Sequence, residues 1–229
     1  MRLDDHIRKL DVNNSEEIQT VKDICFNTAF EGKSMSEVGF NDKEIIVESF
    51  MPYFFKYEPD NCFVVEYNNE IVGYAVGCSQ DFYKYGLKSA LDLGKAFAKT
   101  AHRLITGVYE EENERKYAKW LLLKSWRETP PVPLRKYGHF HFNILPYHRR
   151  CGFGTALLKK LFKNFVNQGV NQVFANTYQI NGDDYWPNNF RFKSRTNGTK
   201  KFEDEHKYVQ TTCWDHVLDK RVYLNTIYM

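Results

Sequence analysis

The fold of this chain is decided by residues 138–169, which read GHFHFNILPYHRRCGFGTALLKKLFKNFVNQG. The stretch begins as an apolar strand, passes through an arginine-rich loop and ends as an amphipathic helix that Gly169 can terminate. The loop contains Arg149-x-x-Gly152-x-Gly154 directly before the helix. A glycine loop at a helix start gathers free backbone N–H groups at the positive end of the helix dipole. The pattern therefore predicts an anion site, usually for phosphate. The alternative is a solvated basic turn that the glycines only tighten.

This loop resembles motif A of the acyl-CoA-dependent N-acetyltransferase superfamily (GNAT), whose consensus is Gln/Arg-x-x-Gly-x-Gly/Ala between the fourth strand and the third helix. The resemblance implies that the loop amides bind the pyrophosphate of coenzyme A, with Arg149 and Arg150 adding positive charge. The residues that it implies in cofactor binding are Asn143, Ile144, Leu145, Arg149, Arg150, Cys151, Gly152, Phe153, Gly154 and Thr155.

The first part of the chain predicts a strand, two helices and a hairpin, which is the usual first half of the acetyltransferase fold. The pairs Asn14/Glu17 and Asn41/Glu44 resemble capping signals at two helix starts, and Pro52 limits the second helix or lies in its final turn. The expected elements are a strand at 6–10, helices that begin near Asn14 and Asn41, and a hairpin of 61–66 and 71–78 that turns at Asn68-Asn69.

Residues 80–137 predict a pair of helices inserted between the third and fourth strands. Apolar residues recur at helical spacing in both parts, and three prolines in 130–133 end the second helix. The apolar positions are Leu87, Leu91, Phe97, Ala101, Leu104, Ile105 and Val108, then Tyr117, Trp120, Leu121 and Trp126. After the anion loop and its helix, we expect a strand at 170–178 and a short helix or turn at 181–189. Two last strands, 190–196 and 207–217, should flank a polar loop.

Together these elements predict an α/β protein, an α+β sandwich with a GNAT-like arrangement. A central mixed, mostly antiparallel sheet is flanked by helices, and the helical insertion 80–137 lies over the acceptor side. We expect one acetyltransferase-like domain over residues 1–229.

Two histidines of the strand before the loop are candidates for proton transfer. His139 and His141 are two residues apart, so they share one face of the strand while Phe140 and Phe142 share the other. Paired imidazoles beside the cofactor loop could relay a proton near neutral pH. Arylalkylamine N-acetyltransferases are similar in carrying His-x-His on this strand, which implies a deprotonating role. The alternative is that one or both are hydrogen-bonded histidines of the core or its rim.

Many members of the superfamily use a tyrosine after the fifth strand to protonate the leaving thiolate. The resemblance points to Tyr185, five residues before Phe190, with Tyr178 as its rival and a packing tyrosine as the alternative. If the histidines do not act, the first carboxylates to consider as bases are Asp183, Asp184 and Glu66.

Two further features can be interpreted either as functional or as ordinary structure. Cys151, at the helix start, could be a nucleophile, but we expect it to contribute its backbone. The acidic run Glu110, Glu111, Glu112 and Glu114 could attract a cationic amine or form a solvated helix face.

Composition narrows the classes of function that we expect for the chain. The 229-residue chain has a net charge of +3, which gives no case for a nucleic-acid surface. Its five cysteines are widely spaced without a Cys-x-x-Cys pair, so we expect no metal site and no disulfide framework. The charged N-terminus is unlike a signal peptide, and no apolar run approaches about 18 residues. A cytoplasmic protein without a membrane partner is expected, and a homodimer is allowed.

The resulting hypothesis is an N-acetyltransferase that moves an acetyl group from acetyl-CoA directly to an amine, most simply a small molecule. One alternative is a non-catalytic acyl-CoA-binding domain of the same fold. Another is a protein-interaction module that uses the aromatic-rich insertion.

Overall fold

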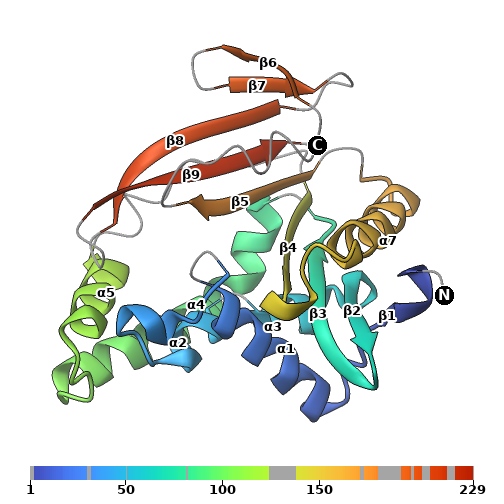
Figure 1. Ribbon diagram of the computed structural model, residues 1–229. Helices are drawn as coiled ribbons and strands as arrows, with labels where there is room; N and C mark the ends of the chain where they lie inside the picture. The colour runs from blue at the N-terminus through green and yellow to red at the C-terminus, as the bar shows by residue number, and fades with distance from the viewer. Residues whose placement is uncertain are drawn as a thin grey trace.

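The computed structural model describes residues 3–29, 32–49, 51–80, 82–123, 138–170, 173–179, 192–196, 199–202, 207–215 and 220–228 (Figure 1). Within these residues the strands form one nine-stranded sheet in the order β1-β2-β3-β4-β5-β9-β8-β7-β6. Neighbouring strands are antiparallel except β4 and β5, which are parallel. The predicted mixed, mostly antiparallel sheet is therefore confirmed.

The first helices begin where short polar side chains cap them. A 3-10 turn (Leu3–His6) leads into β1 (Ile7–Lys9), and α1 (Ser15–Thr28) follows. The Asn14 side chain accepts hydrogen bonds from the first N–H groups of α1, as expected. The cap of α2 (Lys43–Glu48) is Asp42 and not Asn41, because the Asp42 carboxylate accepts from the backbone N–H of Ile45 at 3.2 Å. A separate helix, α3 (Met51–Tyr57), holds Pro52 in its first turn, where a missing N–H costs nothing.

The predicted hairpin is present as β2 (Cys62–Tyr67) and β3 (Glu70–Cys78). Its two turn residues, Asn68 and Asn69, both have positive φ, 53° and 64°. This is the conformation of a type I′ turn, which matches the twist of the flanking strands, and asparagine tolerates it better than most residues.

Alternate residues of the sheet face two different cores. Tyr74, Val76 and Cys78 of β3 pack with α1 and α3. Ala75 of the same strand packs on the other side with α7 (Phe153–Asn167). Val72 packs there as well, because it lies where the β2–β3 pairing shifts register between Val65 and Glu66. This alternation places Phe140 of β4 (Gly138–Ile144) against α7. The period-2 rule then puts His139 and His141 on the side of α1 and α3.

Two helices, α4 (Phe82–Ile105) and α5 (Glu112–Leu123), lie between β3 and β4 in the chain. Charged and polar contacts fix them to α2. Arg103 forms ion pairs with Asp42 and Glu44, and the Tyr109 hydroxyl donates to Asp42 at 3.0 Å. The far boundary of the predicted insertion and Trp126 lie outside the described residues. No helix in the described part of the chain is long and apolar enough to cross a membrane.

The C-terminal strands differ from the expected pair. β5 (Val173–Gln179), β6 (Phe192–Thr196) and β8 (Lys207–Asp215) match predicted strands, but two more are present. β7 (Thr199–Phe202) lies inside the stretch expected to be a polar loop, and β9 (Lys220–Tyr228) pairs with both β5 and β8. The polar-loop prediction was wrong because hairpin strands at a sheet edge can be polar, and Asn197-Gly198 is itself a hairpin signal.

Candidate active site

The sheet changes character where β4 and β5 meet. The two strands pair only at Gly138↔Val173 and His139↔Phe174, although β5 continues to pair with β9 as far as Gln179. Figure 1 shows the two strands diverging beyond this point. Residues 140–144 of β4 therefore have no described strand partner on the β5 side, and backbone groups freed from a ladder need another partner, such as a ligand.

The glycine-containing loop brings the start of α7 close to this divergence. Gly152 is the N-cap of α7 with φ 86°, and no side chain caps the helix. The first hydrogen bond of the helix runs from the N–H of Ala156 to the carbonyl of Gly152 at 3.1 Å. The N–H groups ahead of Ala156 lack partners within the helix. They form the positive end of a 15-residue helix, which is the physical basis for anion binding.

The two glycines of the loop have different explanations. Gly152 is required by the protein itself, because of its positive φ and because an added Cβ would lie 2.7 Å from a Leu3 methyl. An added Cβ at Gly154 would lie 3.6 Å from Phe142 and 3.9 Å from Ile144, ordinary van der Waals distances. Packing therefore does not demand glycine at 154, whereas the close approach of a ligand to the backbone would.

The two arginines of the loop are also unlike each other. The Arg149 guanidinium donates to the carbonyl oxygens of Ile144 (2.8 Å) and Gly32 (3.0 Å), so it braces the loop against the segment after α1. Arg150 is exposed and holds a positive φ of 62°. Arg150 is thus the arginine presented to solvent at the helix start.

The other residues implied in cofactor binding divide by exposure. Cys151 and Thr155 are exposed, while Phe153 is 5% exposed and anchors the helix in the α7 core. The Cys151 thiol lies 3.5 Å from the Arg149 carbonyl. The backbone N–H of Leu145 donates to Val72 at 2.9 Å. A contact of Leu145 with a cofactor would therefore use its other atoms.

The paired histidines face the α1 and α3 side, as the strand period requires. The His139 ring lies 6.0 Å from the Phe54 ring, and the His141 ring stacks on Tyr74 at 5.8 Å. Burial lowers the pKa of His139 to about 3, with His141 adding to the effect, and lowers the pKa of His141 to about 4. This direction runs against the expected titration near neutral pH, and both residues keep part of their surface exposed.

Two residues lie next to His141, and one of them was not anticipated. The Tyr74 hydroxyl lies 2.8 Å from Nδ1 of His141, and the Asn143 side chain donates to that hydroxyl at 3.3 Å. Tyr74 is fully buried, and burial raises its pKa well above the ordinary tyrosine value. Asn143 was expected from the loop motif, but Tyr74 is an unremarkable strand tyrosine in the sequence. Only the β3–β4 register, which places Tyr74 opposite Asn143, reveals the contact.

The remaining candidates do not join this site in the described residues. Tyr185, Asp183 and Asp184 lie outside them, and for Tyr178 only the backbone within β5 is described. In the acidic run, Glu110, Glu111 and Glu112 are exposed, but Glu114 is 7% exposed and accepts from the backbone N–H of Asn41 at 2.8 Å. That glutamate joins α5 to the segment before α2, so the run is not a uniform solvated face.

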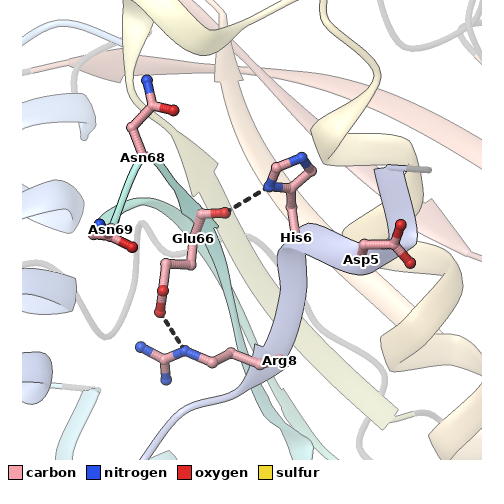
Figure 2. A pocket seen from close by; sticks show the side chains of 6 residues that line it. All are labelled: Asp5, His6, Arg8, Glu66, Asn68 and Asn69. Carbon is pink, nitrogen blue, oxygen red and sulfur yellow. Dashed lines mark hydrogen bonds and ion pairs between the residues drawn. The ribbon is translucent and has the colours of Figure 1, made fainter. Parts of the chain in front are cut away.

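Glu66 belongs to a different place. It lines a pocket of about 250 Å³ at the β1 edge with Asp5, His6, Arg8, Asn68 and Asn69 (Figure 2). Figure 2 shows its carboxylate held by Arg8, at 2.6 Å, and its carbonyl oxygen held by His6, at 2.9 Å. A second pocket of about 330 Å³ lies between β1 and α7. Neither is lined by the anion loop or the histidine pair.

Among the described residues no cluster of three His, Cys, Asp or Glu could hold a metal ion.

Comparison with known proteins bears on the family and the fold of the chain. Residues 33–182 match the family model described as the acetyltransferase (GNAT) family. No curated protein matches the sequence. The solved structure of SsHAT is similar, with a TM-score of 0.57, 19% identity and 96% of each chain covered. An N-acetyltransferase from Staphylococcus aureus Mu50 has a TM-score of 0.50 and 12% identity over 97% of this chain and 96% of that one.

Another solved acetyltransferase has a TM-score of 0.50 and 14% identity over 96% of this chain and 97% of that one. At such identities the likeness is one of fold. The family model, however, covers more than half of the sequence. The chain belongs to the GNAT acetyltransferase family.

Proposed function

We propose that this protein transfers an acetyl group from acetyl-CoA to the nitrogen of a small amine, in one direct step. Membership of the GNAT family supports a transferase that uses an acyl-CoA. The observation that carries the proposal is the uncapped start of α7, where Gly152 and Gly154 leave the backbone open beside the divergence of β4 and β5.

The residues of the loop fit an acyl-CoA. The N–H groups at the start of α7 would hold the pyrophosphate, and exposed Arg150 would add charge. Residues 140–144 of β4 would bind the extended thioester arm through backbone groups without a β5 partner. When bound, the acyl-CoA supplies an activated acyl group and a thiolate leaving group. The protein contributes orientation and proton transfer.

Proton removal is the second requirement of the reaction. A lysine-like ammonium group has a pKa of about 10.4, so it is almost wholly protonated at neutral pH. Because burial keeps His139 and His141 neutral, each can hold a hydrogen bond to the amine or to a water without first losing a proton. The lowered pKa makes either ring a weak base, so the one that accepts the proton would act on an ammonium group whose own pKa is lowered by desolvation. Tyr185 is our candidate acid for the thiolate.

The proposal is tested by binding and turnover on the full chain. Calorimetry with acetyl-CoA and with CoA measures binding. Release of free thiol with a panel of amines, followed by mass detection of the acetylated product, measures transfer. We expect micromolar binding of acetyl-CoA and amine-dependent thiol release. Binding without thiol release would instead identify a non-catalytic acyl-CoA-binding domain. Failure to bind any acyl-CoA would overturn the proposal and favour an interaction module.

A further inference from the structure

A short chain of polar side chains crosses the buried side of β3 and β4. Asn143 donates from its Nδ2 to the hydroxyl of Tyr74 at 3.3 Å, and that hydroxyl lies 2.8 Å from Nδ1 of His141. Tyr74 is 0% exposed, so water does not compete for its hydroxyl. Buried hydroxyls of this kind satisfy their hydrogen-bonding capacity within the protein.

The direction of each hydrogen bond follows from what the groups can donate. A tyrosine hydroxyl has one proton to donate, and its oxygen can accept. Because Asn143 donates to the oxygen, the hydroxyl proton stays free for a second partner, and accepting one bond makes the hydroxyl a stronger donor. Nδ1 of a neutral imidazole is a good acceptor if the ring hydrogen is on Nε2. The chain then runs from Asn143 through Tyr74 to His141.

The opposite direction would require His141 to donate from Nδ1 and Tyr74 to donate elsewhere. Among the described residues, a further neighbour of the Tyr74 hydroxyl is the thiol of Cys25. Burial raises the pKa of Cys25 to about 11, so it is a neutral thiol, and neutral sulfur is a weak acceptor. Exchanging a hydroxyl-to-imidazole bond for a hydroxyl-to-sulfur bond in a buried site loses hydrogen-bond energy.

We propose that Tyr74, supported by Asn143, is a positioning residue that fixes His141 as the tautomer with hydrogen on Nε2. In that form Nε2 of His141 donates a hydrogen bond and cannot accept a proton. The two histidines of β4 then differ in role. His141 is a neutral donor of the kind that polarises a carbonyl oxygen, and His139 is the imidazole left for proton transfer. This division of roles rests on the proposed acyl transfer, but the tautomer itself does not.

The experiment is nitrogen NMR on the full chain with ¹⁵N-labelled histidine, at pH 7 and without acyl-CoA. Long-range ¹H–¹⁵N correlations distinguish the ring nitrogen that carries hydrogen from the one that does not. A His141→Gln variant assigns the His141 signals by their loss. We expect wild-type His141 to carry hydrogen on Nε2 alone. Tyr74→Phe removes the donor to Nδ1, so signals of the Nδ1–H tautomer should appear.

Tyr53→Phe is the matched control. Tyr53 is also buried, at 1% exposed, and its hydroxyl lies 3.4 Å from the thiol of Cys78, which pairs across the sheet with His139 and not with His141. This variant should leave the His141 signals unchanged. Wild-type His141 with hydrogen on Nδ1, or an unchanged tautomer in folded Tyr74→Phe, would overturn the proposal. The wild-type spectrum decides the first point even if Tyr74→Phe does not fold. Absence of thiol release would refute the proposed function and leave the tautomer result standing.

Discussion

The guanidinium of Arg149 donates a hydrogen bond to the carbonyl oxygen of Gly32, 3.0 Å away and 117 positions earlier in the chain. A second bond, to the Ile144 carbonyl at 2.8 Å, ties the same side chain to the end of β4. The first arginine of the loop thus ties the loop and the end of β4 to a segment that is distant in sequence. Its neighbour Arg150 has its charge in solvent, and the two residues should respond differently to substitution.

We expect Arg149→Met to reduce the free energy of unfolding by about 1–3 kcal/mol, because two partly buried carbonyls lose a charged donor. Arg150→Met should stay within about 0.5 kcal/mol of wild type, as is usual at an exposed position. It should weaken acetyl-CoA binding and reduce the salt dependence of that binding. Urea unfolding and calorimetry at two salt concentrations measure both effects. Equal stability losses in the two variants would show that the bracing role is wrong.

Gly152→Asp should reduce acetyl-CoA affinity at least about 10-fold, which requires only about 1.4 kcal/mol. The change puts a side chain and a negative charge where phosphate must approach, at a residue with φ 86°. Gly169→Asp is the matched control. Gly169 has φ 79°, follows the other end of α7 and has open space around its Cβ position. It should lose comparable stability to backbone strain and keep its affinity. Unchanged affinity in folded Gly152→Asp would exclude this anion site.

Sequence reasoning succeeded where local chemistry decides structure. The hairpin turn at Asn68-Asn69, the cap at Asn14 and the glycine loop before α7 each follow from residues close together in the chain. It failed at the polar strand β7, where pairing with β6 and β8 replaces hydrophobic alternation. It also failed to separate Arg149 from Arg150, because the carbonyl that binds Arg149 belongs to Gly32.

The same limit applies to the histidine pair. The period of the strand correctly places both rings on one face, but the pKa of each depends on what covers that face. Residues of α1, α3 and β3, such as Phe54 and Tyr74, desolvate the rings. No local pattern around His139 encodes this burial. The partner of His141 is likewise set by strand register, which a single sequence does not reveal.

The contacts between the inserted helices and α2 give a third prediction. The Asp42 carboxylate forms an ion pair with Arg103 and accepts hydrogen bonds from the Tyr109 hydroxyl and the Ile45 N–H. Its side chain is 7% exposed. Arg103→Met would leave this carboxylate without its cation and should cost about 1–3 kcal/mol. We expect faster hydrogen exchange in α4 and α5, unchanged acetyl-CoA affinity and altered KM for the acceptor.

Lys116→Met is the control for that variant. Its ion pair with Glu112 joins one turn of α5 to the next and is exposed, so its loss should cost about 0.5 kcal/mol or less. It should change neither exchange in α4 nor acceptor KM. Unaltered acceptor KM in Arg103→Met, despite loosened helices, would show that the inserted helices do not shape the acceptor site.

The last prediction concerns pH. Burial lowers the pKa of His139 to about 3 and of His141 to about 4 in the folded protein, against about 6.5 when unfolded. Between these values the unfolded state binds more protons, so stability falls as pH decreases from about 6.5. Each histidine lowers the free energy of unfolding by at most about 1.4 kcal/mol for each unit by which the pH falls. Urea unfolding between pH 5 and 7, above the range of most carboxylates, should show this slope, and His139→Gln should reduce it. His102→Gln, at an exposed position of α4, should not.

In the same pH range, kcat/KM should show no limb that His139→Gln removes. A wild-type rate limb near pH 6.5 that disappears in His139→Gln would mean that His139 is solvated and titrates normally, contrary to its burial here.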